Sequence, residues 1–327
     1  MVTPVPLFEH PACRLHDPGP RHPEAQGRLR ALLDAVEADL QLSSRLDRRL
    51  ARAATEQDLL RVHTPAHLAR VRDAALAARQ EAAPVWLDED TAVSGDSWEA
   101  ALGAAGCALS AADAVVAGAT AAFALARPPG HHASADRAMG FCLFNNVAVA
   151  VRHLQARGAA ERVLVVDWDA HHGNGTQDIF YEDPSVYVLS LHLSRHYPGT
   201  GKAAERGAGR GRGTTRNVPV PRGTTASEYR ARFLGALDDA LAAFAPDLVV
   251  ASVGLDCLAG DPEGGLPLAP EDLHRLTTDL VDRLPAHAGR HCVGVLEGGY
   301  ALDRIGGGLV QVLRGLAGLP PARARAD

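Results

Sequence analysis

Short runs of β-branched and other apolar residues alternate along the chain with longer amphipathic segments. Five such runs predict buried strands, at residues 121–125, 162–166, 186–191, 248–252 and 292–296. Apolar residues spaced three and four apart predict helices at residues 29–40, 66–79, 97–117, 145–157, 227–244, 271–284 and 303–316. The repeated order of strand, loop and helix predicts an α/β fold with a mostly parallel sheet and helices on both faces.

The length and composition fit one large α/β domain. The chain has 327 residues, of which 46% are hydrophobic and 22% are charged, so we expect a single domain over residues 1–327. The longest apolar stretch, residues 103–125, contains Asp113. It therefore predicts a buried helix followed by a strand, with no membrane contact. The glycine- and arginine-rich segment 199–216 predicts a mobile loop.

Charge and cysteine content narrow the classes of partner. The net charge of -6 argues against non-specific nucleic-acid binding and weakly favours cationic substrates. The five cysteines are scattered and include no CxxC pair, so neither a disulfide framework nor a cysteine-rich zinc module is indicated. We expect a reducing, cytoplasmic setting.

Polar residues that can bind a metal follow two of the predicted strands. Asp169 and His171 stand two apart after one strand and project to the same side, and Asp256 follows another strand. Two carboxylates and one imidazole with an open fourth position fit a catalytic zinc site, which keeps room for water and substrate. An isolated Asp-x-His is as often a capping aspartate beside a buried histidine, so the prediction depends on the neighbouring clusters.

Two further clusters carry groups suited to proton transfer and oxyanion binding. His131 and His132 follow a stiff Pro-Pro-Gly turn, and Asp167 and Asn174 are available as acceptors for their rings. Tyr300 follows two glycines, and its hydroxyl could donate to a developing oxyanion. Taken alone, the histidine pair would fit a surface loop and the tyrosine a packed ring at the start of a helix.

The motifs together resemble the histone deacetylase and acetylpolyamine amidohydrolase family, from about His63 to Leu316. The matching segments, in family order, are RPPGHH, GFCLFNNVA, VDWDAHHGNGTQDIF, SLH, YPGTG, GLDCLAGDP and LEGGY. The resemblance implies an arginase-like fold with an eight-stranded sheet, and a zinc-dependent hydrolase that removes acetyl groups from amines. Asn174, which is Asp in class I members, indicates a class II-like enzyme.

The resemblance also implies a role for each site residue. Zinc would be held by Asp169, His171 and Asp256. His132 would be the general base and acid and His131 its electrostatic partner, oriented by Asn174 and Asp167 respectively, and Tyr300 would polarise the acetyl carbonyl. A structural potassium ion would be bound by Asp167, Asp169, His171, Ser190 and Leu191. The substrate tunnel would be lined by Gly140, Phe141, Tyr197, Glu263 and Gly298.

Glu263 bears on which amine is deacetylated. It stands seven residues after Asp256, where many lysine-directed class II relatives have Leu, and it resembles the acidic residue of the polyamine-deacetylating branch. The resemblance therefore favours a small cationic acetylpolyamine as substrate, with an acetylated lysine peptide as the alternative. A solvated loop carboxylate is the competing interpretation of Glu263.

Two other classes fit less well. An arginase-type amidinohydrolase needs two more metal-binding aspartates, but Gly173 and Leu258 stand in those places. A non-catalytic binding module is disfavoured because the three ligands and Tyr300 are all present.

Overall fold

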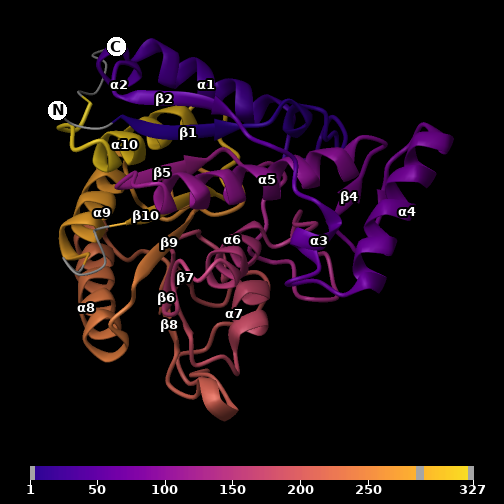
Figure 1. Cartoon of the computed structure of the whole chain (residues 1–327). Coiled ribbons are helices and arrows are strands. Elements are labelled where there is room, and N and C mark those ends of the chain that lie inside the picture. Colours follow the sequence, from indigo (N-terminus) through magenta and orange to yellow (C-terminus); the bar gives the residue numbers. More distant parts are fainter. Residues whose placement is uncertain (1–3, 285–290, 323–327) are drawn as a thin grey trace.

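The computed structural model describes residues 4–284 and 291–322, which form an eight-stranded sheet flanked by helices (Figure 1). All neighbouring strands in this sheet are parallel, in the order β2-β1-β5-β10-β9-β6-β7-β8. The strands are β1 (Val5–Glu9), β2 (Leu46–Leu50), β5 (Ala121–Ala124), β6 (Val163–Asp167), β7 (Val186–Leu193), β8 (Thr215–Val220), β9 (Leu248–Val253) and β10 (Cys292–Leu296). A short antiparallel pair, β3 (Val85–Trp86) and β4 (Ala92–Val93), lies outside it.

Helices form two layers against the sheet. One layer contains α5, α6 and α7, and the other contains α1, α10, α9 and α8, each packed on the next. The helices are α1 (Gly27–Ala38), α2 (Leu40–Ser43), α3 (Glu56–Leu59), α4 (Pro65–Glu81), α5 (Ser97–Val116), α6 (Asn146–Ala156), α7 (Asn174–Phe180), α8 (Ala226–Phe244), α9 (Pro270–Arg283) and α10 (Ile305–Leu316). Two 3₁₀ turns, Pro11–Arg14 and Gly209–Gly211, complete the regular structure of the described residues.

The α/β fold expected from the sequence is confirmed, and the seven expected helices and five expected strands are present within two residues at each end. The central strands are buried on both faces, which explains their continuous apolar runs. The sequence analysis did not expect the sheet strands β1, β2 and β8, the short pair β3 and β4, or the short helices α2, α3 and α7. The interpretation of residues 199–216 as one loop was wrong at its end, because β8 begins at Thr215 and pairs with β7.

Helix α5 is a core helix. Its length and composition would allow it to cross a membrane, but 72% of its most apolar window is buried inside the structure. Small side chains let it pack closely on β1, β5 and β10. At Gly106 an added Cβ would lie only 1.9 Å from the carbonyl oxygen of Arg52.

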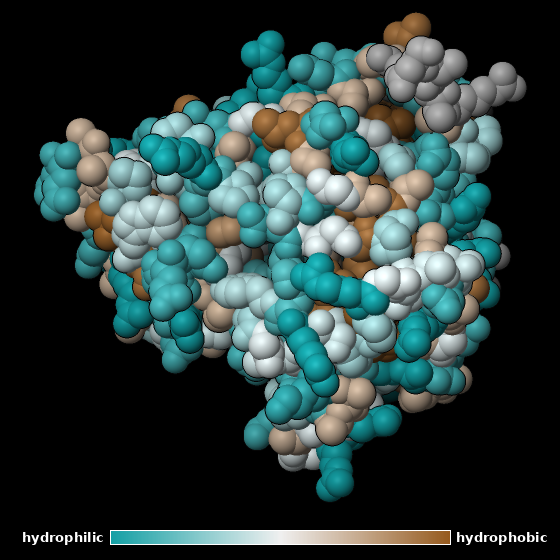
Figure 2. Space-filling view, turned by 180° about the vertical axis from the view of Figure 1, so that it is seen from behind, coloured by the Kyte–Doolittle hydropathy of each residue, from teal (hydrophilic) through white to brown (hydrophobic). Residues whose placement is uncertain are grey.

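The face opposite to that of Figure 1 is mainly polar, with scattered apolar residues (Figure 2).

Candidate active site

The chemistry-bearing clusters meet because they follow four adjacent strands. Strands β5, β10, β9 and β6 are neighbours and parallel, so the loops that leave their carboxyl ends lie at one edge of the sheet. The loop after β5 carries the histidine pair, and the loop after β10 carries Tyr300. The loops after β9 and β6 carry the acidic and histidine residues proposed as metal ligands.

Asp169, His171 and Asp256 form a compact buried triad. One potential ligand atom from each lies within 4.8 Å of the others. Nδ1 of His171 is 3.0 Å from Oδ1 of Asp169 and 3.0 Å from Oδ2 of Asp256. Burial, together with the charge of Asp169, raises the pKa of Asp256 to about 7. A bound cation would offset this repulsion, so the donor set fits a divalent metal with two oxygen ligands and one nitrogen ligand.

Glycines leave room for this triad. The backbone N–H of Gly298 donates to Oδ2 of Asp169 at 2.9 Å. A Cβ at Gly298 would lie 2.3 Å from Oδ2 of Asp256, and a Cβ at Gly254 would lie 2.4 Å from Oδ2 of Asp169. The structure thus places Gly298 directly against the two carboxylates, a packing role that its expected place in the substrate tunnel did not include.

His131 is held between two carboxylates. Its Nδ1 is 3.0 Å from Oδ2 of Asp167, and its Nε2 is 3.7 Å from Oδ1 of Asp169. Burial alone would lower the pKa of His131, but the charges of Asp169 and Asp167 outweigh it and raise the pKa to about 10. The backbone N–H of His131 also donates to the carboxylate of Glu297 at 3.1 Å. The two carboxylates therefore favour the protonated form of His131.

His132 has the opposite character. Burial and the neighbouring His131 and His171 lower its pKa well below the ordinary value. Its Nδ1 lies 2.7 Å from Oδ1 of Asn174. Since an amide oxygen only accepts, Nδ1 carries the proton and Nε2 carries the lone pair. The centroid of its ring lies 4.0 Å from that of His131, so the two imidazoles, whose pKa values are shifted in opposite directions, stand side by side.

Tyr300 is buried, with 9% of its surface exposed, and is fixed through its backbone and its ring. Its N–H donates to Oδ2 of Asp261 at 2.7 Å. Its ring and that of Phe141 pack in an edge arrangement, with 5.6 Å between the ring centroids. The guanidinium of Arg28 lies 4.9 Å from the centroid of the Tyr300 ring. Burial raises the pKa of the phenol well above its usual value, which keeps the hydroxyl protonated as a donor.

Of the expected tunnel residues, Gly140 and Tyr197 lie against His132, and Phe141 lies against Tyr300. The ring of Tyr197 is 5.1 Å from that of His132, in an edge arrangement. The N–H of Gly140 donates to Oδ1 of Asp90 at 3.0 Å. Gly140 and Phe141 both have positive φ, +57° and +67°, and this tight turn brings the backbone against His132.

Glu263 reaches the triad through its backbone. Its carbonyl oxygen lies 3.2 Å from Nε2 of His171 and 2.8 Å from Nε2 of His196. Its N–H donates to Oδ1 of Asp261 at 3.0 Å. Its backbone therefore borders the triad, and the residue is half-buried.

Of the five residues expected to hold potassium, Ser190 and Leu191 lie on β7, the strand next to β6. Ser190 pairs with Asp167 in the register of β6 and β7, and Leu191 follows it in the buried part of β7. Ser190 Oγ lies 2.8 Å from Nδ1 of His192. The structure therefore brings the five residues of that set to adjacent strand ends, and the bound ion stays a prediction.

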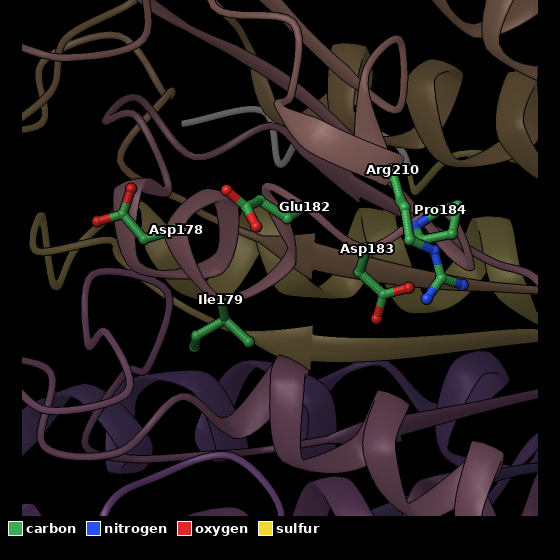
Figure 3. A pocket seen from close by; sticks show the side chains of 6 residues that line it. All are labelled: Asp178, Ile179, Glu182, Asp183, Pro184 and Arg210. Atoms are coloured by element: carbon green, nitrogen blue, oxygen red, sulfur yellow. The ribbon is translucent and has the colours of Figure 1, made fainter.

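Three residues of this site were missed by the sequence interpretation. Arg28 comes from α1, Asp261 from the loop after β9, and His196 from the loop after β7. Each contacts a site residue by a hydrogen bond to its backbone or through its ring, and such contacts leave no spacing pattern. A separate surface hollow of about 480 Å³ (Figure 3) contains none of the expected site residues. Asp178, Ile179, Glu182, Asp183, Pro184 and Arg210 line it.

Comparisons with known proteins find relatives that match most of the chain. Residues 22–316 match the family described as "Histone deacetylase domain". The chain is 41% identical over 281 residues to the histone deacetylase-like amidohydrolase of Pseudomonas aeruginosa, covering 85% of this chain and 72% of that protein. It is 41% identical over 232 residues to the acetylpolyamine amidohydrolase of Mycoplana ramosa, covering 70% of this chain and 66% of that protein.

A solved structure has the same fold. The crystal structure of the HDA15 HD domain matches with a TM-score of 0.89 and 36% sequence identity, covering 99% of this chain and 91% of that one. The family match spans all four loops that carry the site. The chain therefore belongs to the histone deacetylase family and is a hydrolase of the deacetylase class.

Proposed function

We propose that this chain is a zinc-dependent amidohydrolase that removes the acetyl group from acetylpolyamines, small amines that carry a second positive charge. The observation that carries the substrate assignment is the position of Glu263, whose backbone carbonyl faces Nε2 of the triad residue His171. The backbone of an acidic residue thereby lies at the border of the site. Its carboxylate would attract an ammonium group at the far end of a substrate whose acetyl group lies at the triad.

The triad fits zinc by its donor chemistry. Asp169, His171 and Asp256 offer oxygen, nitrogen and oxygen, and three protein ligands leave a position for substrate or water. When bound, zinc supplies Lewis acidity, which polarises a carbonyl group and makes water more acidic. We also propose that a potassium ion is held nearby by Asp167, Asp169, His171, Ser190 and Leu191, as in the family that the sequence resembles.

The two histidines divide the proton chemistry. His132 is neutral with its lone pair on Nε2, so it can accept a proton from the attacking water and return it to the departing amine nitrogen. Asp167 and Asp169 favour the protonated form of His131, which would stabilise negative charge. The amide C–N bond breaks, and acetate and the free amine are released. Tyr300 donates a hydrogen bond to the oxyanion that forms on the acetyl oxygen.

Charge supports a cationic substrate over a neutral one. A charge pair in a partly desolvated cleft contributes roughly 1–3 kcal/mol, enough to bias the choice of substrate. Asp90, whose carboxylate lies at the turn that carries Gly140 and Phe141, adds a second acidic group beside the expected tunnel. One relative is named an acetylpolyamine amidohydrolase and another a histone deacetylase-like amidohydrolase, so an acetyl-lysine peptide is the alternative substrate.

Steady-state kinetics of the zinc-loaded enzyme test the proposal. N8-acetylspermidine, acetylputrescine and an acetyl-lysine peptide are compared side by side. A kcat/KM preference of about 100-fold for an acetylpolyamine, about 2.7 kcal/mol in activation free energy, supports the proposal. Equal or better turnover of the peptide would assign the enzyme to lysine deacetylation.

Two variants separate the charge of Glu263 from general effects. Glu263→Gln keeps the shape of the side chain and removes its charge. We expect it to lower kcat/KM for N8-acetylspermidine at least tenfold, an order-of-magnitude value for loss of one such charge pair, and to leave a neutral acetylated amine unaffected. Glu182→Gln, in the separate hollow of Figure 3, is the matched control and should change neither value.

A further inference from the structure

The carbonyl oxygen of Glu263 accepts two hydrogen bonds from two histidines. His171 donates from Nε2 at 3.2 Å, and His196 donates from Nε2 at 2.8 Å. A carbonyl oxygen has two lone pairs, so both are used here. The shorter of these contacts comes from His196, a residue outside the triad.

His196 is itself held in one orientation. Its ring stacks on the ring of His171, with centroids 4.9 Å apart and planes inclined by 22°. Its Nδ1 faces the guanidinium of Arg222 at 3.4 Å. Because the carbonyl only accepts and the guanidinium only donates, the proton of His196 lies on Nε2 and its lone pair lies on Nδ1. The ring therefore donates to Glu263 in its neutral form.

The backbone N–H of Glu263 is also held by a hydrogen bond. Oδ1 of Asp261 accepts the N–H of Glu263 at 3.0 Å and that of Gly264 at 3.3 Å. Asp261 is buried, with 6% of its surface exposed, so this hydrogen bond does not depend on an exposed and mobile group. The backbone of Glu263 is thus fixed through its N–H by Asp261 and through its C=O by His196 and His171.

We propose that His196 is a positioning residue for substrate selection, which holds the backbone of Glu263 so that its carboxylate meets the distant ammonium of the substrate. The inference rests on the proposed function for the identity of that substrate. Its structural part, that His196 orders the loop of residues 260–265, stands on the contacts alone.

Three variants test the role of His196 in the zinc-loaded enzyme. His196→Phe keeps a ring that can stack on His171 and removes the Nε2 donor. His196→Gln restores an N–H donor at a similar reach. We expect His196→Phe to raise KM for N8-acetylspermidine roughly three- to tenfold, as for loss of one hydrogen bond, with kcat nearly unchanged, and His196→Gln to recover most of it. Glu263→Gln supplies the background for the double variant.

The double variant distinguishes positioning from general damage. If His196 acts through Glu263, His196→Phe has no further effect on KM once Glu263→Gln is present. The inference is overturned if the two effects multiply, or if His196→Phe lowers kcat equally for a neutral acetylated amine.

Amide hydrogen exchange of residues 258–268 provides a readout that needs no substrate. Exchange should be faster in His196→Phe than in the wild type and should return toward the wild-type rate in His196→Gln. Unchanged exchange overturns the inference whatever the substrate is. Faster exchange in an enzyme that shows no preference for acetylpolyamines would leave the loop-ordering role in place and reject the proposed function.

Discussion

The carboxylate of Asp261 links the Glu263 loop to Tyr300. Its Oδ2 accepts the backbone N–H of Tyr300 at 2.7 Å and that of Ala301 at 3.0 Å, while Oδ1 accepts that of Glu263. One buried side chain therefore positions both the proposed oxyanion donor and the proposed selectivity residue. The group that stabilises the reaction and the group that selects the substrate share one support.

Replacement of Asp261 by Asn should impair catalysis without preventing folding. The amide keeps one acceptor oxygen but turns a donor toward N–H groups that also donate. We expect kcat to fall roughly ten- to a hundredfold, the range for one or two unsatisfied buried hydrogen bonds. Asp272→Asn, which weakens a carboxylate bond to the N–H of Ala269 at the start of α9, is the control and should leave kcat unchanged. Equal kcat in Asp261→Asn and wild type would contradict the linkage.

Replacement of Tyr300 by Phe isolates the hydroxyl. The Phe ring can keep its contacts with Phe141 and Arg28, so the site should stay folded. Loss of one oxyanion donor lowers kcat by roughly 10²–10³-fold. We expect KM and zinc content to change little, because the hydroxyl acts on charge that develops in the transition state. A kcat within a factor of two of the wild type would exclude this role for Tyr300.

Each strand of the large sheet that the sequence analysis missed has a feature that weakens the apolar pattern by which strands are predicted. Strand β2, at one edge of the sheet, contains Asp47, Arg48 and Arg49 and is largely exposed, so it has no apolar run. Strand β8 forms the other edge and contains Pro219. Strand β1 is buried but contains Pro6, which lowers the strand signal. Central strands could be predicted because burial on both faces demands continuous apolar residues.

The site residues also include some that could be predicted from the sequence and some that could not. Asp169, His171 and Asp256 could be predicted because their residue types carry the chemistry and parallel strands bring their loops to one edge. Asp261 and His196 could not, because they act on backbone groups of Glu263 and Tyr300. Which carbonyl or N–H a side chain reaches depends on the path of the loops, and no spacing in the sequence encodes that path.

Gly140 is close enough to His132 for one added methyl group to move the ring. A Cβ at Gly140 would lie 2.4 Å from Cδ2 of His132. Gly140→Ala should therefore lower kcat, and we expect a loss on the order of tenfold or more, as for a misplaced general base. The residue also has a positive φ of +57°, so the variant should lose about 1 kcal/mol of stability for backbone strain.

Gly158→Ala separates the strain from the displacement. Gly158 has a similar φ of +63°, and a Cβ there would meet nothing within 4 Å. In urea denaturation Gly158→Ala should lose only the stability that backbone strain costs, and Gly140→Ala should lose more because its Cβ also clashes with the buried His132 ring. Only Gly140→Ala should lose activity. Equal losses of kcat in the two variants would attribute the effect to backbone strain.

His63 is a buried histidine outside the triad whose ring bridges two loops. Its Nδ1 faces the carbonyl of Ser134 at 3.0 Å, and its Nε2 accepts the N–H of Asn145 at 2.9 Å. Burial, with a smaller contribution from His67, lowers its pKa from 6.5 to about 3. Asn145 caps α6, so His63 supports the segment that follows the histidine pair.

The pKa of His63 predicts that the protein loses stability on acidification. Between pH 6.5 and about 3 the unfolded chain binds a proton at this residue and the folded chain does not, so the free energy of unfolding falls as the pH falls. From pH 7 to pH 5 this one residue should remove about 2 kcal/mol. His63→Gln, which cannot titrate, should be less stable at pH 7 but should lose about 2 kcal/mol less over the same interval. Urea denaturation at the two pH values measures both changes, and parallel losses in the two proteins would show that His63 is protonated in the fold or contributes no linkage.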